Sequence, residues 1–229
     1  MKAAMTKEAC IFDFDGVLVD SERVLVKMWG RAAAEYGYTL RKEHFIPSLG
    51  RTLEEIERMQ MRQFGPKYPF KKVLEKVQQF FHTYIQTEGL PQVDGVLDVR
   101  NYFADREYKL AVASSTYSQE LSFRMQKAGL EGLFDVVLGG DQILNSKPAP
   151  DIFLKAAQDL GVDPAQCVVL EDSENGVLSA KRAGMCVFAV QNLGPITDAM
   201  RENADKVFSS HHALLQFLRE DWDGSGERC

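Results

Sequence analysis

Residues 8–22, EACIFDFDGVLVDSE, join a short apolar run to two aspartates and a glycine. An apolar run of this length without polar alternation is typical of a strand that is buried on both faces of a sheet. Asp13, Asp15 and Gly16 follow it at once. A single aspartate at such a place is usually an ordinary turn residue. The role of this pair therefore depends on what the other strands carry at their ends.

The segment after this strand, from residue 21 to about residue 89, predicts almost only helix. Apolar residues such as Val24, Met28 and Ala32 recur every four positions, which predicts one buried helix face. Glycine and proline residues divide the segment into about four helices. No further strand is expected between the first strand and residue 92.

From residue 92 onward, helices and strands are predicted to alternate. Several of the expected helices end at a glycine, as in Leu160-Gly161 and Ala183-Gly184, a common way for a helix to end. Strands without polar alternation that are separated by helices predict a parallel sheet covered on both faces. The four further strands are expected at residues 110–114, 136–138, 167–171 and 186–190. The first strand belongs to the same sheet, so the helical segment is an insertion after it.

The composition excludes several classes of protein. Of the 229 residues, 45% are hydrophobic and 26% are charged, which is ordinary for a globular chain. The net charge of −6 argues against a nucleic-acid partner, which would favour a basic face. No apolar run approaches the roughly 20 residues of a membrane span, so no membrane partner is expected. The oligomeric state is left open.

Cysteine and histidine positions suggest structural roles. The four cysteines have no CxxC spacing, and Cys10, Cys167 and Cys186 lie in apolar runs. Buried, reduced thiols and a cytoplasmic location are therefore predicted. His211 and His212 fall in the predicted C-terminal helix region, far in sequence from every candidate site residue, and both are expected on the surface.

Polar side chains follow the predicted strands at their carboxyl ends, where open parallel sheets bind their ligands. Each has a simpler interpretation when taken alone, such as a helix cap or a solvated lysine. Their convergence on one edge of the sheet favours a common site. The set consists of Asp13 and Asp15, Ser114 and Ser115, Lys147, and Glu171 with Asp172.

Four carboxylates in one place are unfavourable unless a cation neutralises them. Oxygen donors without a nearby histidine or cysteine favour Mg²⁺, an ion that suits phosphate substrates. Even with Mg²⁺ and Lys147 the site would remain negative, so one carboxyl group is expected to hold a proton. A carboxylic acid beside a carboxylate is the pairing that covalent phosphoryl transfer requires.

Four segments resemble, in order, the motifs of the haloacid dehalogenase (HAD) superfamily. They are DFDGVLVDSE at 13–22, Ser114 at the end of an apolar strand, SKPAPDIF at 146–153 and LEDSENG at 170–176. The insertion between the first two motifs is similar to the helical cap of the phosphoglycolate phosphatase and β-phosphoglucomutase branch. The resemblance implies an α/β fold with a Rossmann-like parallel sheet core, residues 1–21 and 92–229. An all-helical cap domain, residues 22–91, would be inserted into it.

The resemblance also implies a role for each site residue. Asp13 would attack phosphorus, and Asp15 would protonate the leaving alcohol and then deprotonate water. Ser114, Ser115 and Lys147 would bind the phosphate group. Mg²⁺ would be held by Asp13, by Asp15 through its main-chain carbonyl, and by Asp172, with Glu171 at the edge of the site.

These roles describe a Mg²⁺-dependent phosphatase, a phosphoric monoester hydrolase, which acts on a small phosphorylated metabolite such as a sugar or organic-acid phosphate. Asp15 argues against a dehalogenase, which would lack the second aspartate and the metal. The main alternative is a β-phosphoglucomutase-type phosphosugar mutase. The resemblance to that mutase fails at two positions. This chain has Leu25 where the mutase has a histidine, and Tyr117 where the mutase has a lysine. A non-catalytic binding role is a third hypothesis, and the presence of every motif residue argues against it.

Overall fold

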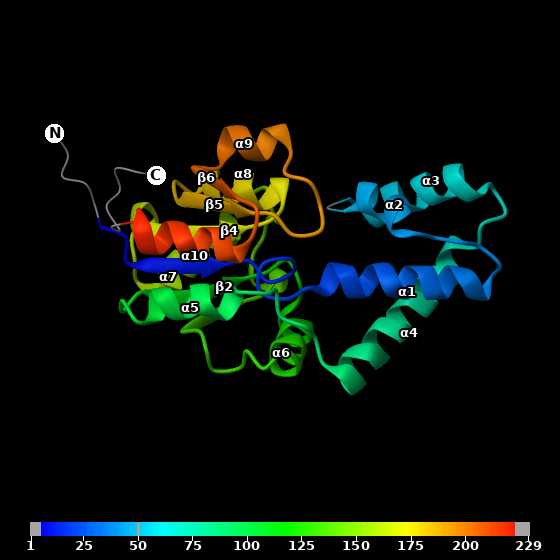
Figure 1. Cartoon of the computed structure of the whole chain (residues 1–229), viewed down its shortest axis with the longest axis horizontal. Helices are drawn as coiled ribbons and strands as arrows, with labels where there is room; N and C mark the ends of the chain where they lie inside the picture. The colour runs from blue at the N-terminus through cyan, green and yellow to red at the C-terminus, as the bar shows by residue number, and fades with distance from the viewer. Residues whose placement is uncertain (1–5, 50, 223–229) are drawn as a thin grey trace. The chain divides into compact units, whose positions relative to one another are not determined.

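The computed structural model describes residues 6–49 and 51–222, which form two compact units (Figure 1). The first unit contains the described residues of Met1–Asp20 and Pro91–Cys229. The second unit is the helical segment Ser21–Leu90, apart from residue 50. The cap role of that segment stays a prediction.

The first unit is built on a sheet of six parallel strands in the order β3-β2-β1-β4-β5-β6. The strands are β1 (Ala9–Phe12), β2 (Lys109–Ala113), β3 (Val136–Leu138), β4 (Cys167–Glu171), β5 (Cys186–Val190) and β6 (Lys206–Phe208). The N-terminal strand β1 lies between β2 and β4, where Ile11 is in register with Ala111 and Val169. The predicted α/β class with a Rossmann-like parallel sheet is confirmed. Strand β6 was not predicted, because its three residues form no apolar run.

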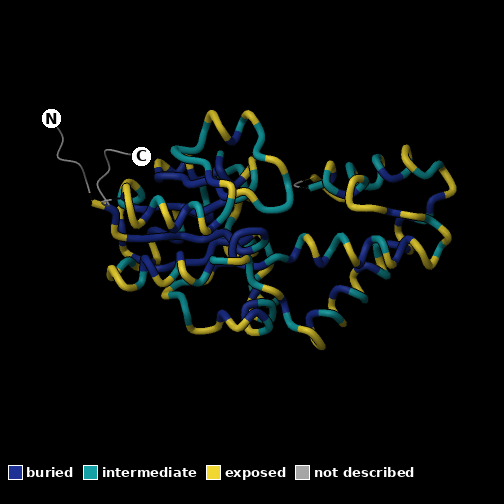
Figure 2. The backbone as a smooth tube through the Cα atoms, in the orientation of Figure 1, coloured by how far each residue is buried: buried dark blue, intermediate teal, exposed yellow. Residues whose placement is uncertain are grey.

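Helices cover both faces of this sheet, and for this reason the strands carry no polar alternation. Every residue of β1, β4 and β5 is buried, as the dark strands in Figure 2 show. On one face, α5 (Val96–Ala104) packs against α10 (His211–Glu220). On the other face, α7 (Asp151–Leu160) contacts α8 (Glu174–Arg182), with Ile152, Phe153 and Val177 in one apolar cluster with the strands. The two remaining helices of the unit are α6 (Ser118–Lys127) and α9 (Asp198–Asn203).

The second unit is held together mainly by α1 (Ser21–Glu35) packed against α4 (Phe70–Glu88). Trp29 of α1 stacks on Phe70 of α4 with ring centroids 5.8 Å apart. The shorter helices are α2 (Lys42–Phe45) and α3 (Leu53–Phe64). Thr52 begins α3 with a capping box, because its hydroxyl accepts from the main chain of Glu55 while the Glu55 carboxylate accepts from Thr52.

The chain leaves and re-enters the sheet unit at neighbouring points. The amide of Asp20 donates to the carbonyl of Pro91 at 2.8 Å, and the amide of Val93 donates to the carbonyl of Leu18 at 3.0 Å. Val19 and Gln92 form an antiparallel bridge between the same segments. An insertion with adjacent ends leaves the hydrogen bonding of the sheet undisturbed.

The surface position predicted for His211 is wrong. His211 is 1% exposed, because it lies on the inward face of α10 with Leu214, Leu215 and Leu218 at helical spacing. Neither of its ring nitrogens has a hydrogen-bond partner. The neighbouring His212 is exposed, and its Nε2 lies 3.0 Å from Oδ2 of Asp94.

The buried His211 should make stability depend on pH. Burial, with a smaller contribution from His212, lowers the pKa of His211 from 6.5 to about 4. The unfolded chain binds this proton more readily, so the free energy of unfolding should fall by roughly 3 kcal/mol between pH 6.5 and pH 4. Urea unfolding at several pH values measures this slope. His211→Leu should flatten it and His212→Gln should not, whereas equal slopes in the wild type and His211→Leu would contradict the explanation.

The cysteines follow the prediction only in part. Cys10 and Cys167 are free and buried, and burial raises the pKa of both thiols, that of Cys167 to about 12. The prediction of a reduced thiol is wrong for Cys186, which is disulfide-bonded. The absence of a CxxC spacing excludes pairing between near neighbours but not between cysteines that are distant in sequence. Among residues 6–49 and 51–222, no helix is both long and apolar enough to cross a membrane.

Candidate active site

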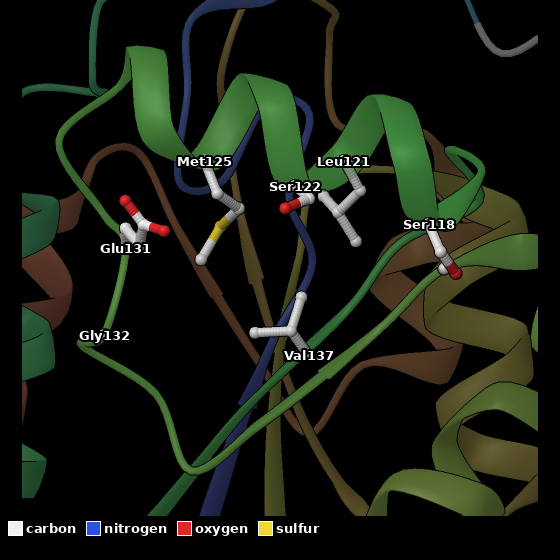
Figure 3. A pocket seen from close by; sticks show the side chains of 8 residues that line it. Ser118, Leu121, Ser122, Met125, Glu131, Gly132 and Val137 are labelled. Atoms are coloured by element: carbon white, nitrogen blue, oxygen red, sulfur yellow. The ribbon is translucent and has the colours of Figure 1, made fainter.

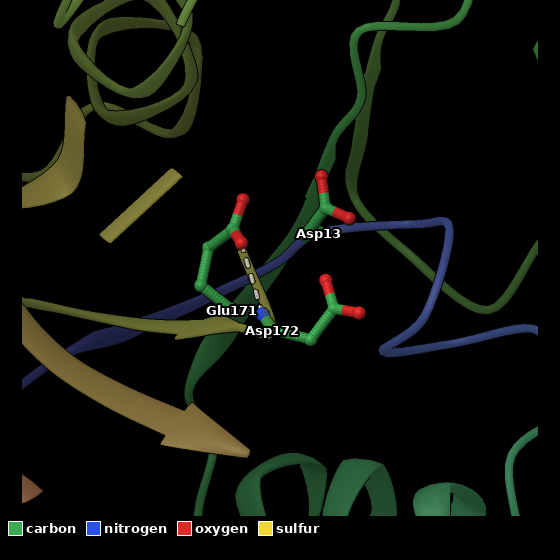
Figure 4. Close-up of side chains that lie close together, drawn as sticks. All are labelled: Asp13, Glu171 and Asp172. Carbon is green, nitrogen blue, oxygen red and sulfur yellow. Dashed lines mark hydrogen bonds between the residues drawn. The ribbon is translucent and has the colours of Figure 1, made fainter. Parts of the chain in front are cut away.

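An acidic cluster lies where two neighbouring strands end. Asp13 directly continues β1, and its amide donates to the carbonyl of Leu170 at 2.9 Å. Glu171 is the last residue of β4, and Asp172 follows it. Each of the three residues offers a carboxylate oxygen within 4.8 Å of the others, and Figure 4 shows them gathered at this edge of the sheet. The structure thus brings together three of the four acids that the sequence assigned to one site.

Lys147 supplies a positive charge inside this cluster. Its Nζ lies 2.5 Å from Oδ1 of Asp13 and 2.7 Å from Oε1 of Glu171. It also donates to the carbonyl of Ala113 at the end of β2, at 3.1 Å. The three charged side chains are at most 10% exposed, so their interaction is only weakly screened by solvent.

The charges of the cluster shift the protonation of its members. Burial raises the pKa of Asp13 to about 7, with Lys147 opposing the rise and Glu171 adding to it. Burial also works against the charge of Lys147, but the two carboxylates outweigh it and hold its pKa above the ordinary value. Two carboxylates face one lysine, so the lysine neutralises only part of their negative charge. A cation bound beside them would favour the ionised form of Asp13.

Both carboxylate oxygens of Glu171 make hydrogen bonds or ion pairs. Its Oε2 accepts hydrogen bonds from the amides of Asp172 and Ser173, at 2.9 and 2.8 Å, and from the Ser173 hydroxyl at 2.9 Å. Its other oxygen contacts Lys147. Since both oxygens are engaged, Glu171 fixes the lysine and the loop after β4. Asp13 and Asp172 are candidates for metal ligands, each with a carboxylate oxygen near that of Glu171.

The carboxylate of Asp15 lies beside the segment that follows β2. Its Oδ2 accepts from the Thr116 hydroxyl at 3.0 Å, and its Oδ1 lies 3.3 Å from Nη1 of Arg124. It is 30% exposed and is not one of the three converging carboxylates. The sequence assigned a metal contact only to its main-chain carbonyl. Thr116 and Arg124 were not predicted as site residues. Thr116, like Ser114, follows the end of β2. Arg124 lies in α6 and belongs to none of the motifs.

The two predicted phosphate-binding serines lie directly after β2. Ser114 is 1% exposed, its amide donates to Leu138, and its hydroxyl accepts from the amide of Thr116 at 3.1 Å. Ser115 is exposed. Because β2 is the neighbour of β1 in the sheet, these serines end at the same edge as Asp13. Their role in binding phosphate remains a prediction.

A separate cavity of about 260 Å³ lies between α6 and β3. In Figure 3, Leu121 and Met125 of α6 point toward Val137 of β3. None of the acids of the cluster, nor Lys147, lines it. Its lining consists of Ser118, Leu121, Ser122, Met125, Glu131, Gly132, Val137 and Gly139.

Comparison with known proteins identifies the family. The family model described as haloacid dehalogenase-like hydrolase matches residues 10–190, which include every candidate site residue from Asp13 to Asp172. The chain belongs to this family. The HAD resemblance seen in the sequence is thereby confirmed.

Several named relatives of this HAD protein are phosphatases. A phosphorylated carbohydrates phosphatase from Thermotoga maritima is 34% identical over 183 residues, 78% of this chain and 82% of the relative. The fructose-1-phosphate phosphatase of Escherichia coli is 32% identical over 179 residues, 76% of this chain and 92% of the relative. A crystal structure from Thermotoga maritima, provisionally named a β-phosphoglucomutase, has a TM-score of 0.78 and 31% identity. The matched region covers 94% of this chain and 100% of the chain in that crystal structure. The chain is a phosphoric monoester hydrolase of the HAD family.

Proposed function

We propose that this HAD phosphatase hydrolyses a small phosphorylated carbohydrate in a Mg²⁺-dependent reaction through a phosphoaspartate on Asp13. The observation that carries the proposal is the position of the Lys147 Nζ, within 2.7 Å of both Asp13 and Glu171. Asp172 presents a third carboxylate within 4.8 Å of both acids. The proposed nucleophile, a buried cation and two further carboxylates thus lie at one edge of the sheet.

The donor atoms of the cluster fit Mg²⁺. They are carboxylate oxygens, with no histidine or cysteine among the converging residues of the described chain, and such a set favours a hard cation. Asp13, Asp172 and the main-chain carbonyl of Asp15 would hold the ion. When bound, Mg²⁺ would neutralise charge on the transferred phosphoryl group.

The chain's own residues supply the nucleophile and the proton transfers. Lys147 fixes Oδ1 of Asp13, so that the other carboxylate oxygen can face phosphorus. A bond forms between this oxygen and phosphorus while the bond to the leaving alcohol breaks, and Asp15 gives its proton to the alcohol. Asp15 then accepts a proton from water, whose oxygen attacks phosphorus and releases Asp13. Ser114 and Ser115 would donate hydrogen bonds to the phosphoryl oxygens.

The carbohydrate class is supported by the relatives, two of which are named for phosphorylated carbohydrates and for fructose 1-phosphate. The mutase alternative is supported by the provisional name of the Thermotoga maritima structure. A mutase must also bind a second phosphate group. Tyr117, which is 70% exposed beside the predicted phosphate site, offers no cation for it.

The experiment that tests the proposal is a panel of phosphorylated metabolites with Mg²⁺ or with a chelator. The panel includes fructose 1-phosphate, and β-glucose 1-phosphate together with a bisphosphate primer. We expect release of inorganic phosphate from a carbohydrate phosphate, and a loss of about 100-fold or more on chelation. Formation of glucose 6-phosphate without release of phosphate would instead support the mutase.

Gly16 provides a test of the metal site in which no carboxylate is removed. Its φ is +91°, and a Cβ added there would lie 1.9 Å from Oδ2 of Asp172. Gly16→Ala should therefore displace Asp172 and raise the Mg²⁺ concentration needed for half-maximal phosphate release by about tenfold or more.

Gly184→Ala is the matched control for this variant. Gly184 has a similar φ of +76°, but a Cβ there would meet nothing within 4 Å. Both variants carry the strain of a positive φ, and only Gly16→Ala adds the collision. An equal Mg²⁺ requirement in the two variants would show that Asp172 is not a ligand.

A further inference from the structure

The carboxylate of Asp15 is held at both of its oxygens by the segment that follows β2. Thr116, three residues after the strand, donates to Oδ2 at 3.0 Å. Arg124, two turns into α6, places Nη1 at 3.3 Å from Oδ1. Asp15 itself lies on the loop after β1, so these contacts join two neighbouring strand ends.

Arg124 is in turn fixed by its own helix. Its Nε lies 2.8 Å from Oε1 of Glu120, one helical turn earlier, and its side chain is 17% exposed. Because the guanidinium group is planar and rigid, an anchor at Nε also limits where Nη1 can point. Glu120, Arg124 and Asp15 therefore form a chain of contacts from α6 to the loop after β1.

Such a support is needed more for Asp15 than for Asp13. Asp13 is buried and bound by Lys147, whereas the side chain of Asp15 is 30% exposed and would otherwise exchange between staggered rotamers. Proton transfer requires the carboxyl group to lie within hydrogen-bond reach of the reacting oxygen. Each carboxyl oxygen has two lone pairs, so both contacts can persist while Asp15 carries a proton.

We propose that Arg124 is a positioning residue for the hydrolytic reaction. Together with Thr116 it holds the Asp15 carboxyl group in the orientation from which protons are exchanged with the leaving alcohol and with water. The inference rests on the proposed function, because that function gives Asp15 its acid and base roles.

The leaving group provides the test. The value of kcat/KM reports transfer of the phosphoryl group to Asp13, the step in which an alcohol must be protonated. A dinitrophenolate leaves without a proton, whereas the alkoxide of a carbohydrate does not. Arg124→Met should therefore lower kcat/KM by about 10–100-fold for fructose 1-phosphate, or for the carbohydrate phosphate hydrolysed fastest in the panel. For dinitrophenyl phosphate the loss should stay below about threefold.

Three further variants complete the measurement. Thr116→Val removes the contact at the other carboxylate oxygen with little change in volume and should show the same dependence on the leaving group. Arg124→Lys keeps the charge without the planar fork and should recover part of the loss. Lys127→Met removes a cation from the same helix, where Lys127 faces the ring of Phe123, and should behave as the wild type with both substrates.

An equal loss for both substrates in Arg124→Met and Thr116→Val would overturn the inference, since a structural role or a contact with the substrate phosphate affects both alike. The inference would also be overturned if, for the carbohydrate phosphate, Arg124→Met lost no more kcat/KM than Lys127→Met. Activity that survives Asp13→Asn would refute the proposed function itself, whatever the leaving-group pattern. Failure of the two proposals is therefore distinguishable.

Discussion

Asp13→Asn is expected to lower kcat for a phosphorylated carbohydrate by about 10⁴-fold or more. An amide is too weak a nucleophile to replace the carboxylate that we assign to attack on phosphorus. The fold should survive, because Lys147 keeps its contacts with Glu171 and with the carbonyl of Ala113. The variant also removes one of the two carboxylates that compete for this single lysine. Phosphate release and thermal unfolding measure the two effects separately.

Asp159→Asn serves as the control for this variant. Asp159 pairs with Lys155 on the surface of α7, so its replacement changes the charge equally without reaching the cluster. It should leave kcat unchanged. Full turnover in Asp13→Asn would remove Asp13 from the mechanism, and an unfolded Asp13→Asn would show that the carboxylate is needed for the fold.

Lys147→Met is expected to lower both the free energy of unfolding and kcat. It leaves the carboxylates of Asp13 and Glu171, which are 10% and 1% exposed, without their cation. Removing one partner of a buried ion pair typically lowers the free energy of unfolding by about 3–5 kcal/mol. We expect a loss of that size without metal, and a fall in kcat of about 10²–10³-fold. Added Mg²⁺ should restore part of the stability because it neutralises the same carboxylates.

Denaturant unfolding with and without Mg²⁺ checks this result. Lys155→Met, which breaks a half-exposed pair, is the matched control and should change stability by less than about 1 kcal/mol. If Lys147→Met were no less stable than Lys155→Met, the charge balance described for the cluster would be incorrect.

Most of the fold could be predicted because a strand buried on both faces appears in the sequence as an apolar run. Strands β1, β4 and β5 are buried along their whole length, so each appears as an apolar run. Strand β6, Lys206–Phe208, begins with a lysine and has only two apolar residues, so it does not form such a run. The surface position of His211 was a wrong prediction, because distance from the motifs does not determine burial, whereas its helical spacing from Leu214 and Leu218 does.

The candidate site was predictable for a different reason. Parallel strands end at one edge of the sheet, so Asp13 and Glu171 had to meet once β1 and β4 were neighbours. Lys147 reaches the same edge from a loop that precedes α7. Arg124 could not be found in this way, because its contact with Asp15 depends on the direction of one side chain on α6. That direction follows from packing and from Glu120, and no spacing in the sequence encodes it.

The central claim is that the phosphoryl group passes through Asp13. The most direct measurement quenches the reaction in acid during turnover of a carbohydrate phosphate with Mg²⁺ and maps the phosphorylated peptide by mass spectrometry. We expect one phosphoryl group on Asp13, formed and consumed as fast as phosphate is released, and absent from Asp13→Asn. Release of phosphate without phosphorylated Asp13, or with the group on another residue, would contradict the mechanism.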